Sequence, residues 1–347
     1  MERLVDRLAR EQTLPAEELR HLLNDLDSET QAYLHRAACK VARAHFGREI
    51  YIRGLIEIGN ICRNDCRYCG IRRSNRCVER YRLSPETILS CCEEGYRLGL
   101  RTFVLQGGED PAFDDRTLTA LLGEIRRRWP ECAVTLSLGE RPETSYRALF
   151  EAGARRYLLR HETIDTAHYR LLHPEEMSLE HRLECLRALK RIGFQTGTGI
   201  MVGSPEQTVD HIVKDLLFMR EFRPQMIGIG PFIPQHDTPF GTEPAGSAER
   251  TLVLISILRL MHPAALIPST TALATLSEEG RTRGILAGAN VVMPNLSPPA
   301  ERAKYALYEG KAASGAEAAE GVELLRRQLE GIGYRISPSR GDYGERP

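Results

Sequence analysis

Short apolar runs alternate with amphipathic stretches along the chain from about residue 50 onward. Eight runs have the length and β-rich composition of buried strands, at 51–58, 102–106, 133–138, 156–161, 196–203, 226–231, 265–270 and 290–294. Helical patterns lie between them, at 84–98, 114–129, 143–152, 178–192, 208–222, 247–260 and 278–287. This alternation predicts an α/β fold with a parallel sheet and right-handed crossovers. Eight units in about 240 residues match a closed (β/α)8 TIM barrel, with a doubly wound open sheet as the alternative.

The two ends of the chain follow other patterns. The first 50 or so residues have helical spacing and no strand pattern, which predicts an N-terminal helical extension over 1–48. We expect the barrel over 49–310 and a C-terminal helix and tail over 311–347. The tail from about Ser337 is rich in glycine, proline and arginine, and we expect it to be loose.

Composition narrows the class of protein. The 347 residues are 42% hydrophobic, and lysine plus arginine equals aspartate plus glutamate at 47 each. Balanced charge argues against a general nucleic-acid surface. The chain has no apolar run long enough to cross a membrane, and its charged N-terminus does not resemble a signal peptide. We therefore expect a cytoplasmic protein that binds neither nucleic acid nor membrane.

Three of the nine cysteines lie within eight residues of one another, in NICRNDCRYCG (60–70): Cys62, Cys66 and Cys69. Their spacing, C-x3-C-x2-C, follows directly on the first predicted strand, where a barrel has its active face. A structural zinc site needs four ligands, and no fourth ligand is near in sequence. A [4Fe–4S] cube held by three thiolates leaves one iron open for another ligand. The other six cysteines are scattered, and we expect them to be small buried apolar residues.

This trio, with Tyr68 before its last cysteine, resembles the signature of the radical S-adenosylmethionine (SAM) enzymes. The resemblance implies a [4Fe–4S] cluster on Cys62, Cys66 and Cys69. The cluster's open iron binds SAM and reductively cleaves it to a 5′-deoxyadenosyl radical. QGGED (106–110) resembles the segment that contacts the methionyl amino group, and GIMVGSPE (199–206) resembles the one that supports adenine. The SAM contacts implied in this way are Tyr68, Gln106, Gly107, Gly108, Glu109, Ser137, Glu162, Arg182 and Met201.

Further strand-end segments are similar to the HydE family of [FeFe]-hydrogenase maturases: 134–140, 156–163, 227–234, 267–273 and 288–298. The similarity runs from about residue 45 to about residue 310. It implies a radical SAM enzyme of H-cluster assembly that acts on an organoiron–cysteine precursor of the diiron site. The implied partners are the maturases HydG and HydF, with an electron donor such as ferredoxin or flavodoxin. HydE proteins often carry a second, C-terminal cysteine group, but 308–325 has no cysteine here, which predicts a single cluster.

The charges at the end of the fourth predicted strand also point to a site. Strand alternation puts Arg160 and Glu162 on one face and His161 on the other. Buried charges are costly unless they are paired or used, so an ion pair between Glu162 and an arginine is the structural alternative to a role in binding SAM. By the resemblance, Glu162 takes the ribose hydroxyls and Arg182 the methionyl carboxylate. His161 has the pattern of an ordinary packed histidine.

The resemblance also implies a deeper substrate cavity. It would be lined by Thr135, Arg160, Thr270, Thr271 and Tyr305. Hydroxyls and one fixed cation, without a pair of acid–base groups, suit an anionic substrate and radical chemistry. The structural alternative is that Thr270 and Thr271 cap the next helix. Two other functions stay open: a radical SAM mutase or sulfur-inserting enzyme acting on an amino acid or small thiol, and a non-catalytic iron–sulfur carrier.

Overall fold

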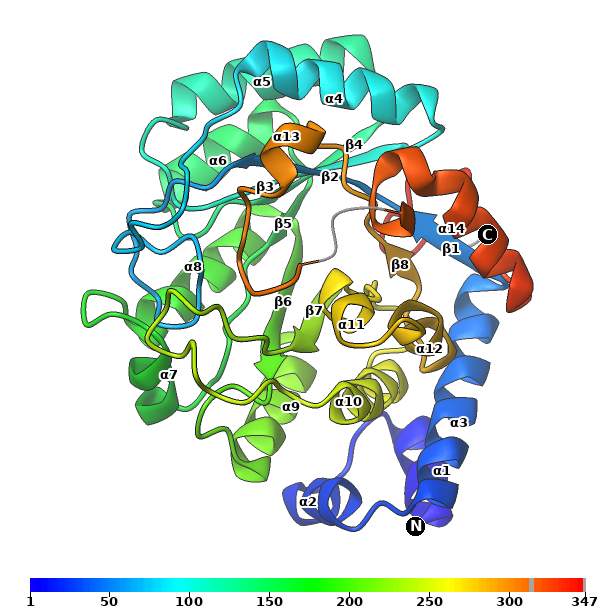
Figure 1. Cartoon of the computed structure of the whole chain (residues 1–347). Helices are drawn as coiled ribbons and strands as arrows, with labels where there is room; N and C mark the ends of the chain where they lie inside the picture. Colours follow the sequence, from blue (N-terminus) through cyan, green and yellow to red (C-terminus); the bar gives the residue numbers. More distant parts are fainter. Residues whose placement is uncertain (312–314, 346–347) are drawn as a thin grey trace.

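The computed structural model describes residues 1–311 and 315–345. Six parallel strands form one sheet in the order β2-β3-β4-β5-β6-β7. They are β2 (Gly54–Gly59), β3 (Thr102–Gly107), β4 (Ala133–Ser137), β5 (Arg156–Leu158), β6 (Gln195–Val202) and β7 (Met226–Pro231). The connecting helices are α4 (Pro85–Arg97), α5 (Asp115–Arg128), α6 (Glu143–Ala152), α7 (Thr166–Leu172), α8 (Leu179–Ile192) and α9 (Val209–Phe222), as Figure 1 shows. The predicted α/β fold with a parallel sheet is confirmed.

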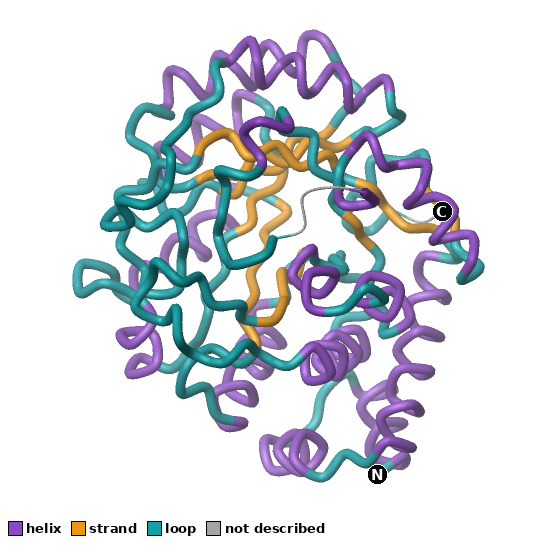
Figure 2. Tube along the Cα trace, in the orientation of Figure 1, coloured by secondary structure: helices purple, strands orange, loops and turns teal. Residues whose placement is uncertain are grey.

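A second, small sheet has the order β8-β1-β9, from β1 (Glu49–Ile52), β8 (Val291–Val292) and β9 (Arg335–Ile336). Isolated parallel bridges join Met226 to Leu266, Pro268 to Val291, and Asn295 to Leu55. These bridges lead from β7 through two short extended segments back to β2. Figure 2 shows the strands curving about the middle of the molecule with most helices outside them.

The seven helices predicted between the strands are all present, the last two as α10 (Ala248–Met261) and α12 (Gly280–Leu286). Four predicted strands differ, and two of them, 156–161 and 290–294, are only shorter than predicted, as β5 and β8. The run 51–58 is split at Arg53, because β1 pairs with β8 whereas β2 pairs with β3. The run 265–270 makes only isolated bridges. Helices not predicted are α7, α11 (Thr271–Leu276) and α13 (Pro299–Arg302), together with two 3-10 turns at Gly315–Glu317 and Ala319–Gly321.

The N-terminal residues form three helices, as predicted: α1 (Glu2–Glu11), α2 (Ala16–Asn24) and α3 (Ser28–Phe46). Asp27 caps α3 by accepting a hydrogen bond from the Thr30 amide. The buried side chains of α1 and α3 pack in one apolar cluster with those of α10, which include Leu254 and Leu258. These helices therefore cover one side of the strand core and lie away from the cysteine loop (Figure 1).

The C-terminal segment is better anchored than expected. α14 (Val322–Gly331) is followed by β9, and the chain then reaches the first residue of β5, Arg156. The fully buried guanidinium of Arg156 donates hydrogen bonds to the Arg340 carbonyl (3.0 Å) and to Asp342 (2.6 Å). The prediction of a loose tail from Ser337 is therefore wrong up to residue 345, because buried Arg156 needs these acceptors. Residues 312–314 and 346–347 of the predicted C-terminal unit lie outside the described residues.

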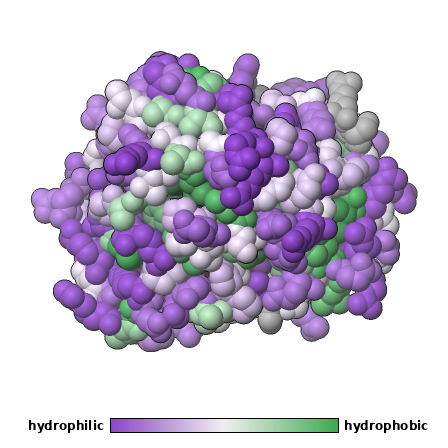
Figure 3. Space-filling model, turned by 90° about the horizontal axis from the view of Figure 1, so that it is seen from above, coloured by the Kyte–Doolittle hydropathy of each residue, from purple (hydrophilic) through white to green (hydrophobic). Residues whose placement is uncertain are grey.

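The surface adds one exclusion. Within 1–311 and 315–345 no helix has the length and apolar character needed to cross a bilayer. The face of the molecule in Figure 3 is mostly hydrophilic, with small apolar areas between polar side chains.

Candidate cofactor site at the carboxyl ends of the strands

The cysteine trio lies in the long loop between β2 and α4. Side chains inside the loop hold its shape: the buried Asn60 amide donates to the carbonyls of Glu79 (2.9 Å) and Lys304 (2.7 Å). The Arg80 guanidinium donates to four carbonyls of the same loop, those of Asn60, Ile71, Arg72 and Asn75. The loop that carries the three thiols therefore has a fixed backbone without regular secondary structure.

The loop packs closely against the end of β3. A Cβ on Gly108 would lie 2.3 Å from the Ile61 carbonyl oxygen and 2.6 Å from the Cys62 Cβ, so only glycine fits there. Burial, followed by the neighbouring Cys62, raises the pKa of Cys69 to about 12. A thiolate at this position therefore needs a compensating positive charge such as iron.

Residues at the ends of β2, β3 and β4 lie side by side in register. Glu57 is paired in register with Gln106, and Gln106 with Ser137. The Gln106 amide lies 3.5 Å from the Tyr305 hydroxyl, to which it donates. Thr135 lies two residues before Ser137, on the same face of the strand. It is buried, and its hydroxyl has no hydrogen-bond partner among the described residues.

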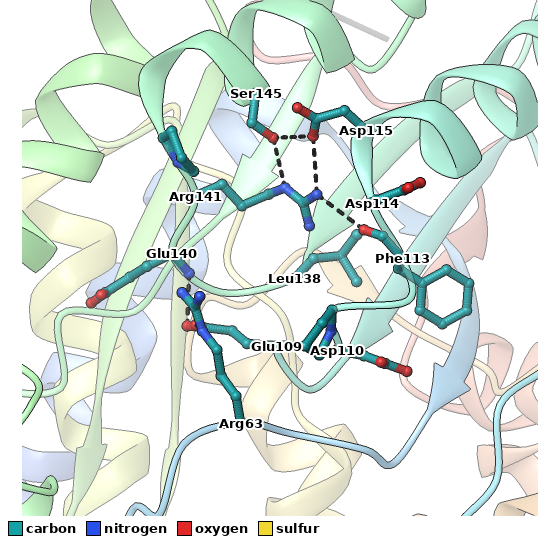
Figure 4. Close-up of a pocket in the computed structure, with 12 residues that line it drawn as sticks. Arg63, Glu109, Asp110, Phe113, Asp114, Asp115, Leu138, Glu140, Arg141 and Ser145 are labelled. Carbon is teal, nitrogen blue, oxygen red and sulfur yellow. Dashed lines mark hydrogen bonds and ion pairs between the residues drawn. The ribbon is translucent and has the colours of Figure 1, made fainter.

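Glu109 ties the cysteine loop to the end of β4. Its carbonyl accepts from the Arg63 amide (3.0 Å), and its carboxylate accepts from the Arg63 guanidinium (2.9 Å). The second carboxylate oxygen accepts from the Glu140 amide at 2.8 Å. Figure 4 shows these contacts at one side of a surface cavity of about 290 Å³, with the Arg141 guanidinium bonded to Ser145, Asp115 and the Phe113 carbonyl on the other side.

Arg182 reaches the same region from α8. Its Nε donates to Glu140 at 2.5 Å, and its Nη1 donates to the Arg160 carbonyl at 2.6 Å. Arg182 is buried, so Glu140 neutralises a charge that would otherwise be costly there. The sequence analysis missed Glu140. Its position three residues after the end of β4 is the one feature that could have pointed to it.

Arg160 and Glu162 form an ion pair at 2.9 Å, as the structural alternative expected. The pair does not satisfy Glu162 completely, because its second carboxylate oxygen is buried with no hydrogen-bond partner in the described chain. Glu162 also has φ of 64°, in the left-handed region. Its amide donates to the Gly199 carbonyl at 3.1 Å. One oxygen of Glu162 is thus available to a hydroxyl-bearing ligand.

Buried groups on β6 and α9 fix the backbone on both sides of Glu162. The imidazole Nδ1 of His161 lies 2.8 Å from the Thr198 hydroxyl. Asp215 accepts from the Ile164 amide at 2.6 Å, and the same oxygen lies 3.4 Å from the His161 Nε2. His161, Thr198 and Asp215 are fully buried. His161 is thus a packed residue, as its pattern predicts, and sequence reasoning missed Asp215.

Tyr68 and Met201 share an apolar cluster with Leu172, Phe232 and Phe240. The Tyr68 hydroxyl lies 3.4 Å from the Nε2 of His173, whose ring stacks on Tyr169 with centroids 3.9 Å apart. Burial, and next the charge of Arg182, lower the pKa of His173 to about 3, so this imidazole is neutral. Tyr68, the residue before Cys69, and Met201, in the middle of GIMVGSPE, therefore meet in one apolar cluster.

Two of the expected substrate residues, Arg160 and Thr270, lie against glycines of β7. A Cβ on Gly228 would lie 3.5 Å from the Arg160 Cδ, and one on Gly230 would lie 3.0 Å from the Thr270 hydroxyl. Thr270 is the N-cap residue of α11, but its side chain makes no cap bond and its buried hydroxyl has no partner among the described residues. Thr271 instead donates to Glu317 at 2.8 Å.

Glu57 and Lys311 are a buried pair that the sequence analysis missed. Glu57 has no exposed surface, and its carboxylate accepts from Asn295 (2.8 Å) and forms an ion pair with Lys311. Lys311 also lies over the Tyr305 ring, 4.9 Å from its centroid. The one available signal was a glutamate inside the apolar run YIRGLIEI.

Comparison with known proteins identifies the family. The model of the Radical SAM superfamily matches residues 56–219. The [FeFe] hydrogenase maturase subunit HydE of Thermotoga maritima is 41% identical over 330 residues, which cover 95% of this chain and 93% of that protein. The chain belongs to the HydE family of radical SAM proteins.

Other members of the superfamily are more distant. The 3-methylornithine synthase of Methanosarcina barkeri is 29% identical over 307 residues, covering 88% of this chain and 86% of that protein. The crystal structure of methylornithine synthase (PylB) has a TM-score of 0.82 at 27% identity, covering 96% of this chain and 97% of that one. The same overall fold therefore extends to enzymes outside the HydE family.

Radical SAM proteins use a [4Fe–4S] cluster and SAM, and the residues of this HydE-family chain fit both. In the described chain, no three His, Cys, Asp or Glu side chains converge on one metal ion. A cubane does not require such convergence, because each cysteine binds a different iron. Near the ends of strands, buried polar atoms of Thr135, Glu162 and Thr270 have no partner among the described residues. Such atoms are costly without a ligand.

Proposed function

We propose that this chain is a radical SAM enzyme of [FeFe]-hydrogenase maturation, the role for which its Thermotoga maritima relative is named. The observation that supports the proposal lies at the cysteine loop and the neighbouring strand ends. A rigid three-cysteine loop packs on the end of β3, next to strand ends whose buried oxygens lack partners. Bound there, the cluster and SAM supply one-electron cleavage of a C–S bond.

The proposal assigns cofactor contacts by residue. Cys62, Cys66 and Cys69 would bind three irons, and Gly107, Gly108 and the Glu109 segment would face the methionyl amino group. The free oxygen of Glu162 suits a ribose hydroxyl. Arg182 would share its guanidinium between Glu140 and the methionyl carboxylate. Ser137, Gln106, Met201 and Tyr68 complete the proposed contacts.

We also infer that the strands close into a (β/α)8 barrel. The bridges from Met226 to Leu266, Pro268 to Val291 and Asn295 to Leu55 supply the three connections, through two short extended segments, that the six-stranded sheet lacks. Closure would bring the ends of β2 and β7 to one rim, which an open sheet would keep apart. The cysteine loop and Thr270 would then border one cavity.

For the substrate we propose an organoiron–cysteine precursor of the diiron site, received from HydG and passed towards HydF. Its carboxylate and cyanide would accept hydrogen bonds from Arg160, Thr270 and Thr135. The hydroxyls of Thr135 and Thr270 are buried without partners among the described residues. Tyr305 and Thr271 border the same space, with Thr271 turned to Glu317.

A second candidate is a mutase acting on an amino acid, favoured by the PylB-like fold. The two functions differ in product, so one experiment separates them. We would reconstitute the protein anaerobically with iron and sulfide, add SAM and reductant, and identify the nucleoside and organic products. We expect 5′-deoxyadenosine and, in a mixture with the partner maturases, an active hydrogenase. Rearranged amino acid without maturation would favour the mutase, and a bound cluster without SAM cleavage would favour a carrier.

The thiols provide the variant test. Cys66→Ser replaces a soft ligand by a poor one, so cluster absorbance and SAM cleavage should both be lost. Cys91→Ser is the matched control, because Cys91 is a buried cysteine on α4 outside the trio. A Cys66→Ser protein with its cubane absorbance and activity intact would remove the cluster from this loop.

A further inference from the structure

The cysteine loop carries more positive charge than any cofactor contact explains. Residues 63–82 contain seven arginines and two acids, Asp65 and Glu79, in a chain whose formal net charge is zero. The loop therefore has a surplus of five positive charges, and the rest of the chain has an equal negative surplus. We call residues 63–82 the basic loop.

Four of these arginines have local partners. Arg63, Arg72 and Arg82 form ion pairs with Glu109, Asp65 and Asp110. Arg80 is bonded to carbonyls of the loop. The other three are exposed and have no ion pair or side-chain hydrogen bond with any described residue: Arg67, Arg73 and Arg76. Arginines that serve only to fix a loop would be bonded to it.

A surface hollow brings this charge close to the trio. Arg63 and Arg73 line a cavity of about 340 Å³, together with Met177. The Met177 sulfur lies 3.9 Å from the Cys66 sulfur, so one side chain separates the hollow from a cluster ligand. Three acids on the same wall are already in ion pairs, Asp65, Glu109 and Glu140, and a fourth, Glu176, is exposed.

We propose that the basic loop is the docking surface for an acidic one-electron carrier protein, seated over the hollow at Met177. The carrier is oxidised by one electron and the cluster on the trio is reduced by one, with no bond made or broken. This inference rests on the proposed function, because only a redox cluster needs such a carrier. Unpaired arginines steer an acidic partner to a hollow that the Met177 side chain separates from Cys66.

Steering by charge fits this position better than nucleic-acid binding does. A nucleic-acid surface needs a track of basic residues over many phosphates, whereas this surplus is confined to one loop. Electrostatic steering raises association rates by about 10-fold to 1,000-fold and weakens with salt. The loop therefore speeds and orients association with the carrier in a molecule whose formal net charge is zero.

The test uses the reconstituted holoenzyme and reduced flavodoxin, an acidic one-electron flavoprotein, as probe. The variant is Arg67→Glu with Arg73→Glu and Arg76→Glu. The matched control changes three exposed arginines on α5, α9 and α14 by the same charge: Arg116→Glu, Arg220→Glu and Arg327→Glu. We would measure flavodoxin binding at low and high salt, and 5′-deoxyadenosine formation with flavodoxin and with a small chemical reductant.

We expect the loop variant to bind flavodoxin at least about tenfold more weakly at low salt and to lose the salt dependence. Its SAM cleavage with the small reductant should equal that of the wild type. Equal binding of flavodoxin by the loop variant and the control would overturn the docking surface. Loss of maturation with unchanged flavodoxin binding would also overturn it, because the loop would then serve another partner. Wild-type protein inactive even with the small reductant would instead sink the proposed function.

Discussion

Glu162 shows how many contacts hold one buried carboxylate in an unfavourable backbone conformation. A non-glycine residue at a φ of 64° costs about 1–2 kcal/mol in the backbone. The bonds from the Glu162 amide to Gly199, from the Ile164 amide to Asp215, and between His161 and Thr198 offset that cost. Asp215 is therefore a positioning residue for Glu162, acting from α9 through the Ile164 amide.

Glu162→Gln keeps the shape of the side chain and removes the charge that accepts ribose hydroxyl bonds. Charge-assisted hydrogen bonds contribute about 1.5–3 kcal/mol each, so SAM affinity should fall tenfold to a hundredfold. Titration of SAM into the reconstituted protein measures this fall, and exposed Glu180→Gln on α8 is the matched control. Asp215→Asn should weaken SAM binding less and leave cluster absorbance unchanged. Equal affinity for SAM in Glu162→Gln and wild type would move the ribose site elsewhere.

Arg160→Ala separates substrate binding from cofactor binding. The Arg160 side chain lies over Gly228 and pairs with Glu162, so its loss should leave the cluster intact and SAM binding nearly so. Maturation should be abolished, because the guanidinium is the proposed partner of the anionic substrate. A SAM titration and a maturation assay on the same preparation check this. Full maturation would exclude Arg160 from the substrate site, and lost SAM binding would put it in the cofactor site.

At the scale of single residues, the sequence analysis identified candidate residues that belong to short local motifs. Cys62, Gln106 and Met201 lie in short segments with recognisable spacing. It missed Glu140 and Lys311, whose partners Arg182 and Glu57 are 42 and 254 residues away. Only the fold brings such partners together, and neither residue has an unusual neighbourhood in the sequence.

Among the elements, the contact between the cysteine loop and β3 depends on the absence of a side chain. Gly108→Ala would push a methyl group into the Ile61 carbonyl and Cys62. We expect severalfold lower iron content after reconstitution. Gly123→Ala in α5 is the matched control, since a Cβ there meets nothing within 4 Å and should stabilise the helix by about 0.5–1 kcal/mol. Iron analysis of both reconstituted proteins tests this prediction. Equal iron content in Gly108→Ala and Gly123→Ala would contradict the close packing of the cysteine loop on β3.

The segment after α13 is held to the strands by buried charge. Lys311 pairs with Glu57, and Glu317 pairs with Arg281 while accepting from Thr271. Removing one partner of a buried pair costs about 3–5 kcal/mol. Lys311→Met should therefore lower the urea midpoint by leaving Glu57 unpaired.

The pH dependence of this loss identifies its cause. Burial raises the pKa of Glu57 above its usual 4.5, and Lys311 opposes the rise. A raised folded-state pKa means that the stability contribution is complete below the unfolded pKa and is lost as pH rises through the folded pKa. Without Lys311 the pKa of Glu57 in the folded protein rises further. The loss of stability caused by Lys311→Met should therefore be larger at pH 8 than at pH 6. The Glu57→Gln/Lys311→Met double variant should show no such difference, and equal deficits at both pH values would reject Glu57 as the cause.

The elements themselves divide into predictable and unpredictable ones for physical reasons. α4 was predicted because Ser84, Pro85 and the apolar spacing all act locally. The run 265–270 has strand composition but makes only the bridges at Leu266 and Pro268, and proline cannot donate to a ladder. The tail was misjudged because Arg156, its anchor, lies in a strand far away in sequence.

Across the whole molecule, the carboxyl ends of the parallel strands gather the site from separate segments between Cys62 and Glu162. The cysteine loop follows β2, Glu109 follows β3, Glu140 follows β4 and Glu162 follows β5. Parallel strands put all these loops at one edge, so neighbours at the site need not be neighbours in sequence. This explains why the class of site could be predicted while a distant ion pair such as that of Arg182 with Glu140 could not.

The distribution of cysteines over the molecule sets its iron content. Outside the trio, Cys91, Cys92 and Cys185 are buried, as predicted, and Cys39 and Cys132 are half-buried. Cys77 is exposed, which contradicts the expectation for it. The last cysteine is Cys185, so the segment after α13 supplies no thiol.

One three-cysteine site should hold one cubane, or about four iron atoms per chain. Iron analysis and electron paramagnetic resonance of the reconstituted protein measure the number and type of clusters. Cys77→Ser is the informative control, because an exposed thiol could collect extra iron without forming a built site. We expect its count to match that of the wild type, while Cys69→Ser should lose nearly all bound iron. A reproducible count near eight in the Cys77→Ser protein, with two distinct reduced signals, would require a second cluster ligated by groups other than the trio.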